Sequence, residues 1–175
     1  MPDLPAEATA APAPGAREPS TVRLPPTGGL PPGVRLERLR ADHAPAVLAF
    51  EVENREYFAA RIADRGVDYF AEFADRHQAL VDDQETGVLH FHVLVGDDGR
   101  VIGRVNLVDV ADGSAELGYR IAESATGRGL ATAAVLELCA RAARDYGLID
   151  DVLTRPAGAP HAQSALTPRS SGALA

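Results

Sequence analysis

Two adjacent segments decide the fold, and they read Ala115-Glu116-Leu117-Gly118-Tyr119-Arg120-Ile121 and Thr126-Gly127-Arg128-Gly129-Leu130-Ala131-Thr132. The first segment alternates like a strand, and the glycines of the second open a helix that we expect over 127–146. The first N–H groups of a helix have no internal partner and lie at the positive end of its dipole. Gly127 and Gly129 have no side chain to block this backbone, and Arg128 adds a positive charge. The turn is therefore suited to bind a pyrophosphate.

The two glycines by themselves are compatible with several kinds of turn. An ordinary helix start would use Thr126 as its N-cap residue and tolerate glycines in the first turn. The same helix start could also hold a different anionic ligand. A P-loop requires a lysine, which the chain lacks, and a dinucleotide-binding turn requires a third glycine where Thr132 stands.

The pattern of apolar residues outside these segments predicts the remaining elements. Period-two alternation indicates strands over 34–39, 89–95, 101–110 and 114–121, with turns at 96–99 and 111–113 and a last strand over 149–154. Helical spacing indicates one helix that Asp42 caps and a second helix after Gly66. An antiparallel meander followed by one crossover helix predicts an α+β fold.

The two ends of the chain differ in composition from the middle. Residues 1–32 contain 9 of the 13 prolines, and such a segment buries too little apolar surface to offset its lost entropy. Residues 155–175 consist mostly of Ala, Pro, Ser and Gly. We therefore expect an unstructured arm over 1–32, one folded domain over 33–154 and an unstructured tail over 155–175.

Composition and charge limit the classes of partner. The net charge of -8 argues against a nucleic-acid surface and fits a cationic acceptor such as an amine. Aromatic residues make up only 5% of the chain, so we expect an aliphatic core. Cys139 is the single cysteine, and no apolar run is long enough for a membrane span. We expect a cytoplasmic protein with neither a nucleic acid nor a membrane as partner.

Histidine and cysteine residues do not form a recognisable metal motif. His90 and His92 share one face of a predicted strand, but no third ligand stands at a suitable spacing. Cys139 lies on the predicted crossover helix, where we expect it to be a small buried apolar residue. The sequence therefore predicts no metal site.

The two quoted segments resemble motif A of the GNAT superfamily of N-acetyltransferases. Residues 50–55, the second helix and the hairpin at 99–103 resemble its RimJ/RimL-like branch, whose members acetylate the N-termini of ribosomal proteins. The resemblance covers residues 33–154 and implies a three-layer fold around a mixed, mainly antiparallel sheet. It implies acetyl-CoA as co-substrate, no metal, and a protein N-terminus or small primary amine as acceptor. A homodimer is one possible assembly.

The resemblance also implies the residues of the site. Acetyl-CoA would lie against two sets of residues: Leu117, Gly118, Tyr119, Arg120 and Ile121 of the strand, and Thr126, Gly127, Arg128, Gly129, Leu130, Ala131 and Thr132 of the helix start. Glu116 would be the general base for the acceptor amine. The alternative for Glu116 is an exposed carboxylate or an ion pair with Arg104 or Arg120. Asn54 and Arg55 would bind the acceptor, or else form hydrogen bonds at the helix surface.

After Thr154 the resemblance ends. The family continues with a further helix and a final pair of strands, whereas this chain continues with the low-complexity tail. We therefore expect the C-terminal strands to be missing or atypical, and a shifted reading frame near residue 148 or a truncated gene is our hypothesis. A catalytically inactive CoA-binding remnant is the second interpretation of the chain.

Overall fold

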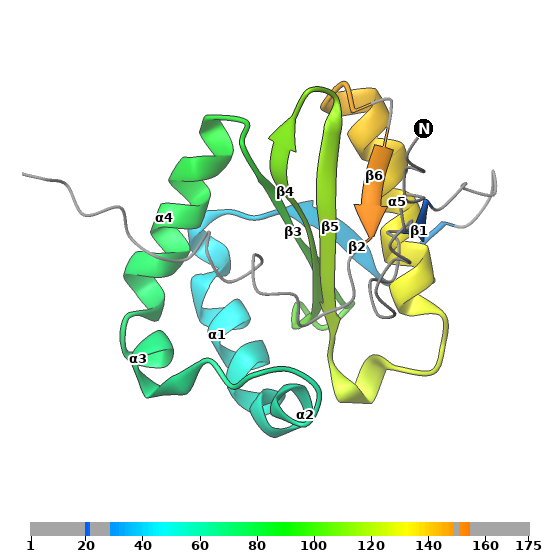
Figure 1. The fold of residues 1–175 in the computed structure, drawn as a ribbon. Coiled ribbons are helices and arrows are strands. Elements are labelled where there is room, and N and C mark those ends of the chain that lie inside the picture. Colours follow the sequence, from blue (N-terminus) through cyan, green and yellow to red (C-terminus); the bar gives the residue numbers. More distant parts are fainter. Residues whose placement is uncertain (1–19, 22–28, 149–150, 155–175) are drawn as a thin grey trace, which may run out of the picture.

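A six-stranded sheet forms the middle layer of the protein (Figure 1). The structure is a computed structural model, and it describes residues 20–21, 29–148 and 151–154. The strand order is β1-β6-β5-β4-β3-β2, and the only parallel neighbours in this described sheet are β5 and β6. The bounds are β1 Ser20–Thr21, β2 Arg35–Arg38, β3 His90–Val95, β4 Val101–Ala111, β5 Ser114–Ile121 and β6 Asp151–Thr154. The predicted mixed, mainly antiparallel sheet is confirmed.

Helices cover both faces of this sheet and complete a three-layer α+β fold (Figure 1). One face carries α1 Ala44–Glu53, α2 Arg55–Ala59, α3 Gly66–Ala71 and α4 Phe73–Glu85, and the other carries α5 Leu130–Asp145. Two short 3-10 helices, η1 Ala41–His43 and η2 Glu123–Ala125, precede α1 and follow β5. No helix of the described ranges is long and apolar enough to cross a membrane.

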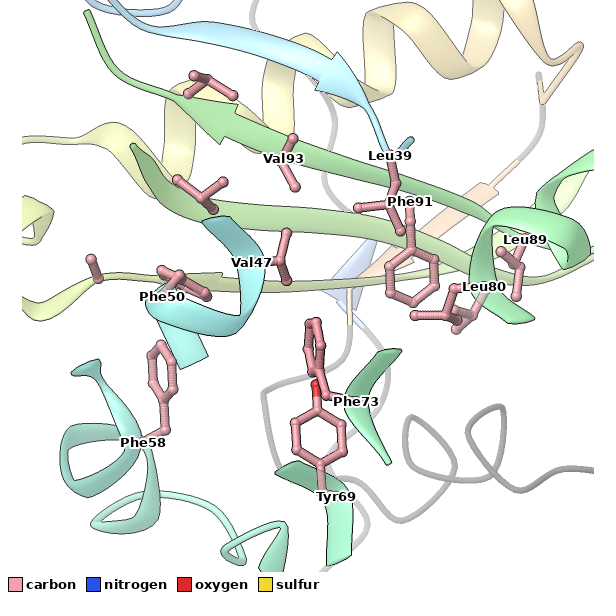
Figure 2. Packing of buried hydrophobic residues seen from close by; sticks show 14 residues of the cluster. Leu39, Val47, Phe50, Phe58, Tyr69, Phe73, Leu80, Leu89, Phe91 and Val93 are labelled. Carbon is pink, nitrogen blue, oxygen red and sulfur yellow. The ribbon is translucent and has the colours of Figure 1, made fainter. Parts of the chain in front are cut away.

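Two separate clusters of buried side chains hold the layers together. The cluster under α5 is aliphatic, as the composition predicts, and includes Leu94, Leu107 and Leu138. The cluster under α1–α4 instead gathers the aromatic residues Phe50, Phe58, Tyr69, Phe73 and Phe91 (Figure 2). The expectation of an aliphatic core is therefore wrong for this layer, because few aromatic residues suffice when they gather on one face.

Each predicted N-terminal helix is divided in two. The first divides at Asn54 into α1 and α2, and the second divides at Glu72 into α3 and α4. The expected cap at Asp42 is also wrong, because Asp42 lies inside η1 and accepts a hydrogen bond from Arg40 Nε at 3.0 Å. Apolar spacing alone did not reveal these breaks, since the side chains on both sides of each break face the same core.

The ends of the chain are described only in part. Within the predicted arm, Ser20–Thr21 pairs with β6, so the expectation of an unstructured segment does not hold for these two residues. Strand β6 confirms the predicted last strand over Asp151–Thr154, and residues 149–150 lie outside the described ranges. The other predictions for 1–28, for the tail over 155–175 and for a changed reading frame fall on residues outside the described ranges.

Two strand glycines differ in the space around them, which gives a test of the packing. A Cβ added at Gly103 would lie 2.9 Å from Cδ1 of both Leu94 and Ile121, whereas a Cβ at Gly118 would meet nothing within 4 Å. We expect Gly103→Ala to lower the free energy of unfolding by about 1–3 kcal/mol through overpacking. Gly118→Ala should change it by less than about 0.5 kcal/mol. Urea denaturation of both variants checks this, and equal losses would contradict the described packing.

Candidate active site

The start of α5 presents open backbone N–H groups. Gly127 and Gly129 have φ of 77° and 72°, a left-handed conformation that favours glycine, and an added Cβ at either would meet nothing within 4 Å. Helical bonding begins with the N–H of Ala133, which donates to the carbonyl of Gly129 at 3.0 Å. The amides before Ala133 in the first turn thus have no intrahelical partner. With the exposed Arg128 beside them, they form a site whose chemistry fits a pyrophosphate.

Residue Thr126 does not cap this helix. Its hydroxyl donates to the carbonyl of Glu123 at 2.7 Å and closes η2, and Gly129 occupies the N-cap position of α5. The helix accordingly begins at Leu130 and not at Gly127. The interpretation of this turn as an ordinary helix start capped by Thr126 is therefore wrong.

Strand β5 extends beyond its described pairing with β6 next to this helix start. Its described pairing with β6 runs from Ser114↔Asp151 to Leu117↔Thr154, whereas its pairing with β4 continues to Gly103↔Ile121. The backbone of residues 118–121 therefore extends past the last described β6 pair, close to where the chain turns into η2 and α5 (Figure 1). An extended ligand group could pair with β5 there.

The predicted cofactor residues divide by the direction of their side chains. Leu117, Ile121 and Leu130 are buried in the cluster under α5, so they can offer a ligand only their backbone. Tyr119 alternates to the α5 face and is 42% exposed, and Thr132 is also exposed. The buried side of α5 contains Leu130, Ala134, Leu138 and Ala142, whereas Ala131 and Val135 are half-buried at its border.

The opposite face of β5 carries Glu116, Gly118 and Arg120, because alternate side chains of a strand point to opposite sides. The space above Gly118 is open, since an added Cβ there would meet nothing within 4 Å. Asn106 is directly opposite Gly118 on β4 and is 9% exposed, and its Oδ1 has no hydrogen-bond partner in the described structure. Glu116 is half-buried and lies opposite Val108 in the register of β4 and β5. A carboxylate and an amide oxygen thus border a space that suits an amine.

A buried ion cluster lies beside this space. Glu51 of α1 is 1% exposed and contacts Arg120 at 3.1 Å, Arg104 at 3.2 Å and Arg65 at 3.8 Å. Burial raises the pKa of Glu51, but the three guanidiniums lower it further, so that its pKa is below the usual value. Burial, together with Arg104 and Arg65, lowers the pKa of Arg120 to about 9. Arg104 and Arg120, predicted from the sequence as alternative ion-pair partners of Glu116, both contact Glu51.

The predicted acceptor residues Asn54 and Arg55 have partners within the chain. Asn54 Nδ2 donates to the carbonyl of Phe50 at 2.8 Å, and its Oδ1 accepts from the N–H of Glu123 at 2.9 Å. Asn54 therefore ties the α1–α2 junction to η2. Arg55 donates to Asp64 at 3.0 Å and 2.5 Å. Arg55 and Arg120 line the same pocket, and Asn54 is not part of its lining.

The two strand histidines contribute to packing. The ring of His90 stacks on Tyr146 with centroids 3.6 Å apart, and His92 Nε2 lies 2.8 Å from the Tyr146 hydroxyl. Burial lowers the pKa of His92 to about 3, which keeps it neutral. Among the described residues no three His, Cys, Asp or Glu side chains are grouped to hold a metal ion. Cys139 is buried on α5, as predicted.

The ion cluster around Glu51 gives a stability test. Glu51→Gln leaves three buried guanidiniums without their carboxylate, so the free energy of unfolding should fall by about 3–5 kcal/mol at pH 7. Since the folded-state pKa of Glu51 is lowered, its contribution is present above the unfolded pKa of about 4.3 and disappears as the pH falls through the folded value. The wild-type advantage should therefore shrink below about pH 4.

Urea denaturation at several pH values measures this difference. The control is Glu53→Gln, which removes an exposed ion pair with Arg100 on the same helix and should cost less than about 1 kcal/mol. A loss that is equal for the two variants, or independent of pH, would contradict the assigned role of Glu51.

Comparison with solved structures supports the fold. The chain is similar to the ribosomal-protein-S5-alanine acetyltransferase from Vibrio fischeri, with a TM-score of 0.64, 16% identity and 70% of each chain covered. It is similar to RimJ from Mycobacterium smegmatis in complex with CoA-disulfide, with a TM-score of 0.54, 24% identity, and 63% of this chain and 58% of that chain covered. It is also similar to a dodecameric spermidine N-acetyltransferase from Vibrio cholerae, with a TM-score of 0.52, 17% identity and 66% of each chain covered.

Comparison by sequence identifies the family. No curated protein matches the chain by sequence. The family described as the acetyltransferase (GNAT) domain, whose members use acetyl-CoA, matches residues 34–159. The resemblance to the RimJ/RimL-like branch is consistent with the structural neighbours. Because the match spans most of the chain, this protein belongs to the GNAT family of acetyltransferases.

Proposed function

We propose that this protein transfers an acetyl group from acetyl-CoA to a primary amine, and that the acceptor is a protein N-terminal amine. The observation that carries the proposal is the position of β5. One end of β5 leads to the open amides of α5, and one face borders the space between Glu116 and Asn106. A donor and an amine could therefore meet across the same strand.

The donor side uses the chain's backbone and one cation. The N–H groups of 127–132 and the guanidinium of Arg128 would hold the pyrophosphate, whereas the Thr126 hydroxyl already donates to Glu123. The edge of β5 at 118–121 would align the rest of the molecule. Bound acetyl-CoA supplies an activated thioester. The buried side chains of Leu117, Ile121 and Leu130 keep this backbone in place from below.

The acceptor side must take up a proton. An α-amino group has a pKa near ~8 and is largely protonated at neutral pH, so it has to lose a proton before it can act as a nucleophile. Glu116 lies on the same face of β5 as the open space at Gly118, and its carboxylate would accept that proton. The Oδ1 of Asn106 would accept a hydrogen bond from the same nitrogen.

The donor site is tested with two glutamate substitutions of the same kind. Gly129→Glu places a negative charge at the start of α5, and Gly147→Glu places it after the other end of this helix, at a similar φ of 67° and with equally open surroundings. Calorimetry should show acetyl-CoA binding weakened more than about 100-fold by the first and unchanged by the second, because only the first repels a pyrophosphate.

Failure of the wild-type protein to bind acetyl-CoA, or equal loss in both variants, would contradict the donor site. Displacement by inorganic pyrophosphate, without any preference for the CoA molecule, would favour the interpretation as a protein that binds another anionic ligand.

The general base is tested by Glu116→Gln. This variant should lower kcat/KM for acetyl transfer by about 10²–10⁴ and leave acetyl-CoA binding unchanged, because only the proton acceptor is lost. Glu37→Gln removes another half-buried strand carboxylate, far along the sheet on β2, and is the control that should keep its activity. Equal rates for Glu116→Gln and wild type would exclude the base role. Binding without any turnover would instead favour the inactive remnant.

A further inference from the structure

Local charge beside the proposed acceptor site is opposite to that of the whole chain. The chain has a net charge of -8, yet the buried cluster combines three arginines, Arg65, Arg104 and Arg120, with the single carboxylate of Glu51. The formal charge of this cluster is therefore positive. Arginine does not readily relieve such an excess by losing its proton, so buried guanidiniums usually lie next to anions.

A pocket opens onto this cluster from the helical side. It is lined by side chains of α1, α2 and α3, the connection between α2 and α3, and the end of β5: Glu51, Arg55, Phe58, Ala59, Ala63, Asp64, Arg65, Phe70 and Arg120. Arg55 and Asp64 pair with each other at its exposed rim. The Arg120 guanidinium lies 5.0 Å from the Phe58 ring, so an aromatic wall faces the charge. The charges of Arg55 and Asp64 cancel at the rim, and the interior of the pocket is therefore positively charged.

Donors in this cluster lack acceptors within the described structure. Arg65 Nε and Nη1 are buried without a hydrogen-bond partner there. Arg104 Nε and Glu51 Oε1 are also without a hydrogen bond, but they form an ion pair with each other at 3.2 Å. The 3.8 Å contact of Arg65 with Glu51 is an ion pair and too long for a hydrogen bond. Buried polar groups are rarely left unbonded, because each unbonded group loses its hydration without compensation. The two unbonded donors of Arg65, which lines the pocket, indicate that an anionic oxygen can bind there.

We propose that this pocket binds a carboxylate of the acceptor molecule, so that the amine acetylated belongs to a compound with a carboxylate close to its amine. The inference rests on the proposed function, because it places the acceptor amine above Gly118. Arg120 follows Gly118 by two residues, a distance of about 6.6 Å along a strand. This spacing suits an acidic residue next to a peptide N-terminus, or the α-carboxylate of a free amino acid. A polyamine would place positive charge against the arginines.

Peptide binding tests the inference independently of turnover. The probes are Ser-Asp-Ala-amide, its neutral counterpart Ser-Asn-Ala-amide, free serine and spermidine, measured by calorimetry on the full chain. We expect the acidic peptide to bind about tenfold more tightly than the neutral peptide, as a charge-assisted hydrogen bond would provide. Free serine as the better ligand would assign the pocket to an α-carboxylate. Equal affinity for the two peptides, or tighter binding of spermidine, would overturn the inference.

Variants of the pocket assign the effect to a residue. Arg65→Gln should remove the preference for the acidic peptide, and Arg65→Lys should retain part of it because the charge remains without the planar fork. Arg61→Gln is the matched control, since Arg61 is exposed on the same connection and stacks on Tyr57 outside the pocket. Arg65→Gln that keeps the full preference would overturn the role of this pocket.

Acetyl transfer to the same compounds separates the two proposals. If neutral amines are acetylated as well as acidic ones, the proposed function stands and the carboxylate pocket is wrong. If the acidic peptide binds selectively but no amine is acetylated, the pocket stands and the proposed function is wrong.

Discussion

The ion pairs of Glu51 connect the helical layer to the functional face of the sheet. Glu51 belongs to α1, whereas Arg104 and Arg120 belong to neighbouring strands and Arg65 precedes α3. A buried carboxylate requires such partners, because it loses its hydration without them. The same contacts set the distance between α1 and the strand that carries Glu116. The pocket proposed for the acceptor therefore depends on an interaction that also stabilises the fold.

Strand β5 brings together features that serve different purposes. Ala115, Leu117 and Ile121 point toward α5 and are apolar and buried, so they anchor the strand. Its opposite face carries Glu116 and the open space at Gly118. Its edge beyond Leu117 extends past the described pairing with β6. A strand has two faces and two edges. One short segment can therefore pack against α5 with one face, present the other face to an acceptor and offer its edge to an extended ligand group.

The positive cluster changes the expectation that follows from composition. A net charge of -8 describes the average field around the protein and favours a cationic acceptor, but recognition depends on the groups that line the pocket. There the arginines outnumber the carboxylates. Exposed acidic groups are screened by salt within about 10 Å, whereas buried charges act strongly on a ligand that displaces water.

Local patterns in the sequence determined much of this protein. The alternation over 114–121 and the bare turn before Leu130 depend on neighbouring residues only, so the strands, the crossover helix and the family could be predicted. The breaks at Asn54 and Glu72 could not, because helical spacing continues across them.

Only the tertiary structure decided which residues surround the space proposed for the acceptor. Glu51 reaches Arg120 across 69 residues of sequence, and Asn106 is opposite Gly118 through strand register. No local pattern encodes such pairings, since they depend on how whole layers pack. The sequence by itself therefore determined the fold and the glycine turn before α5, and the packing of α1 on the sheet decided the charge and shape of the pocket proposed for the acceptor.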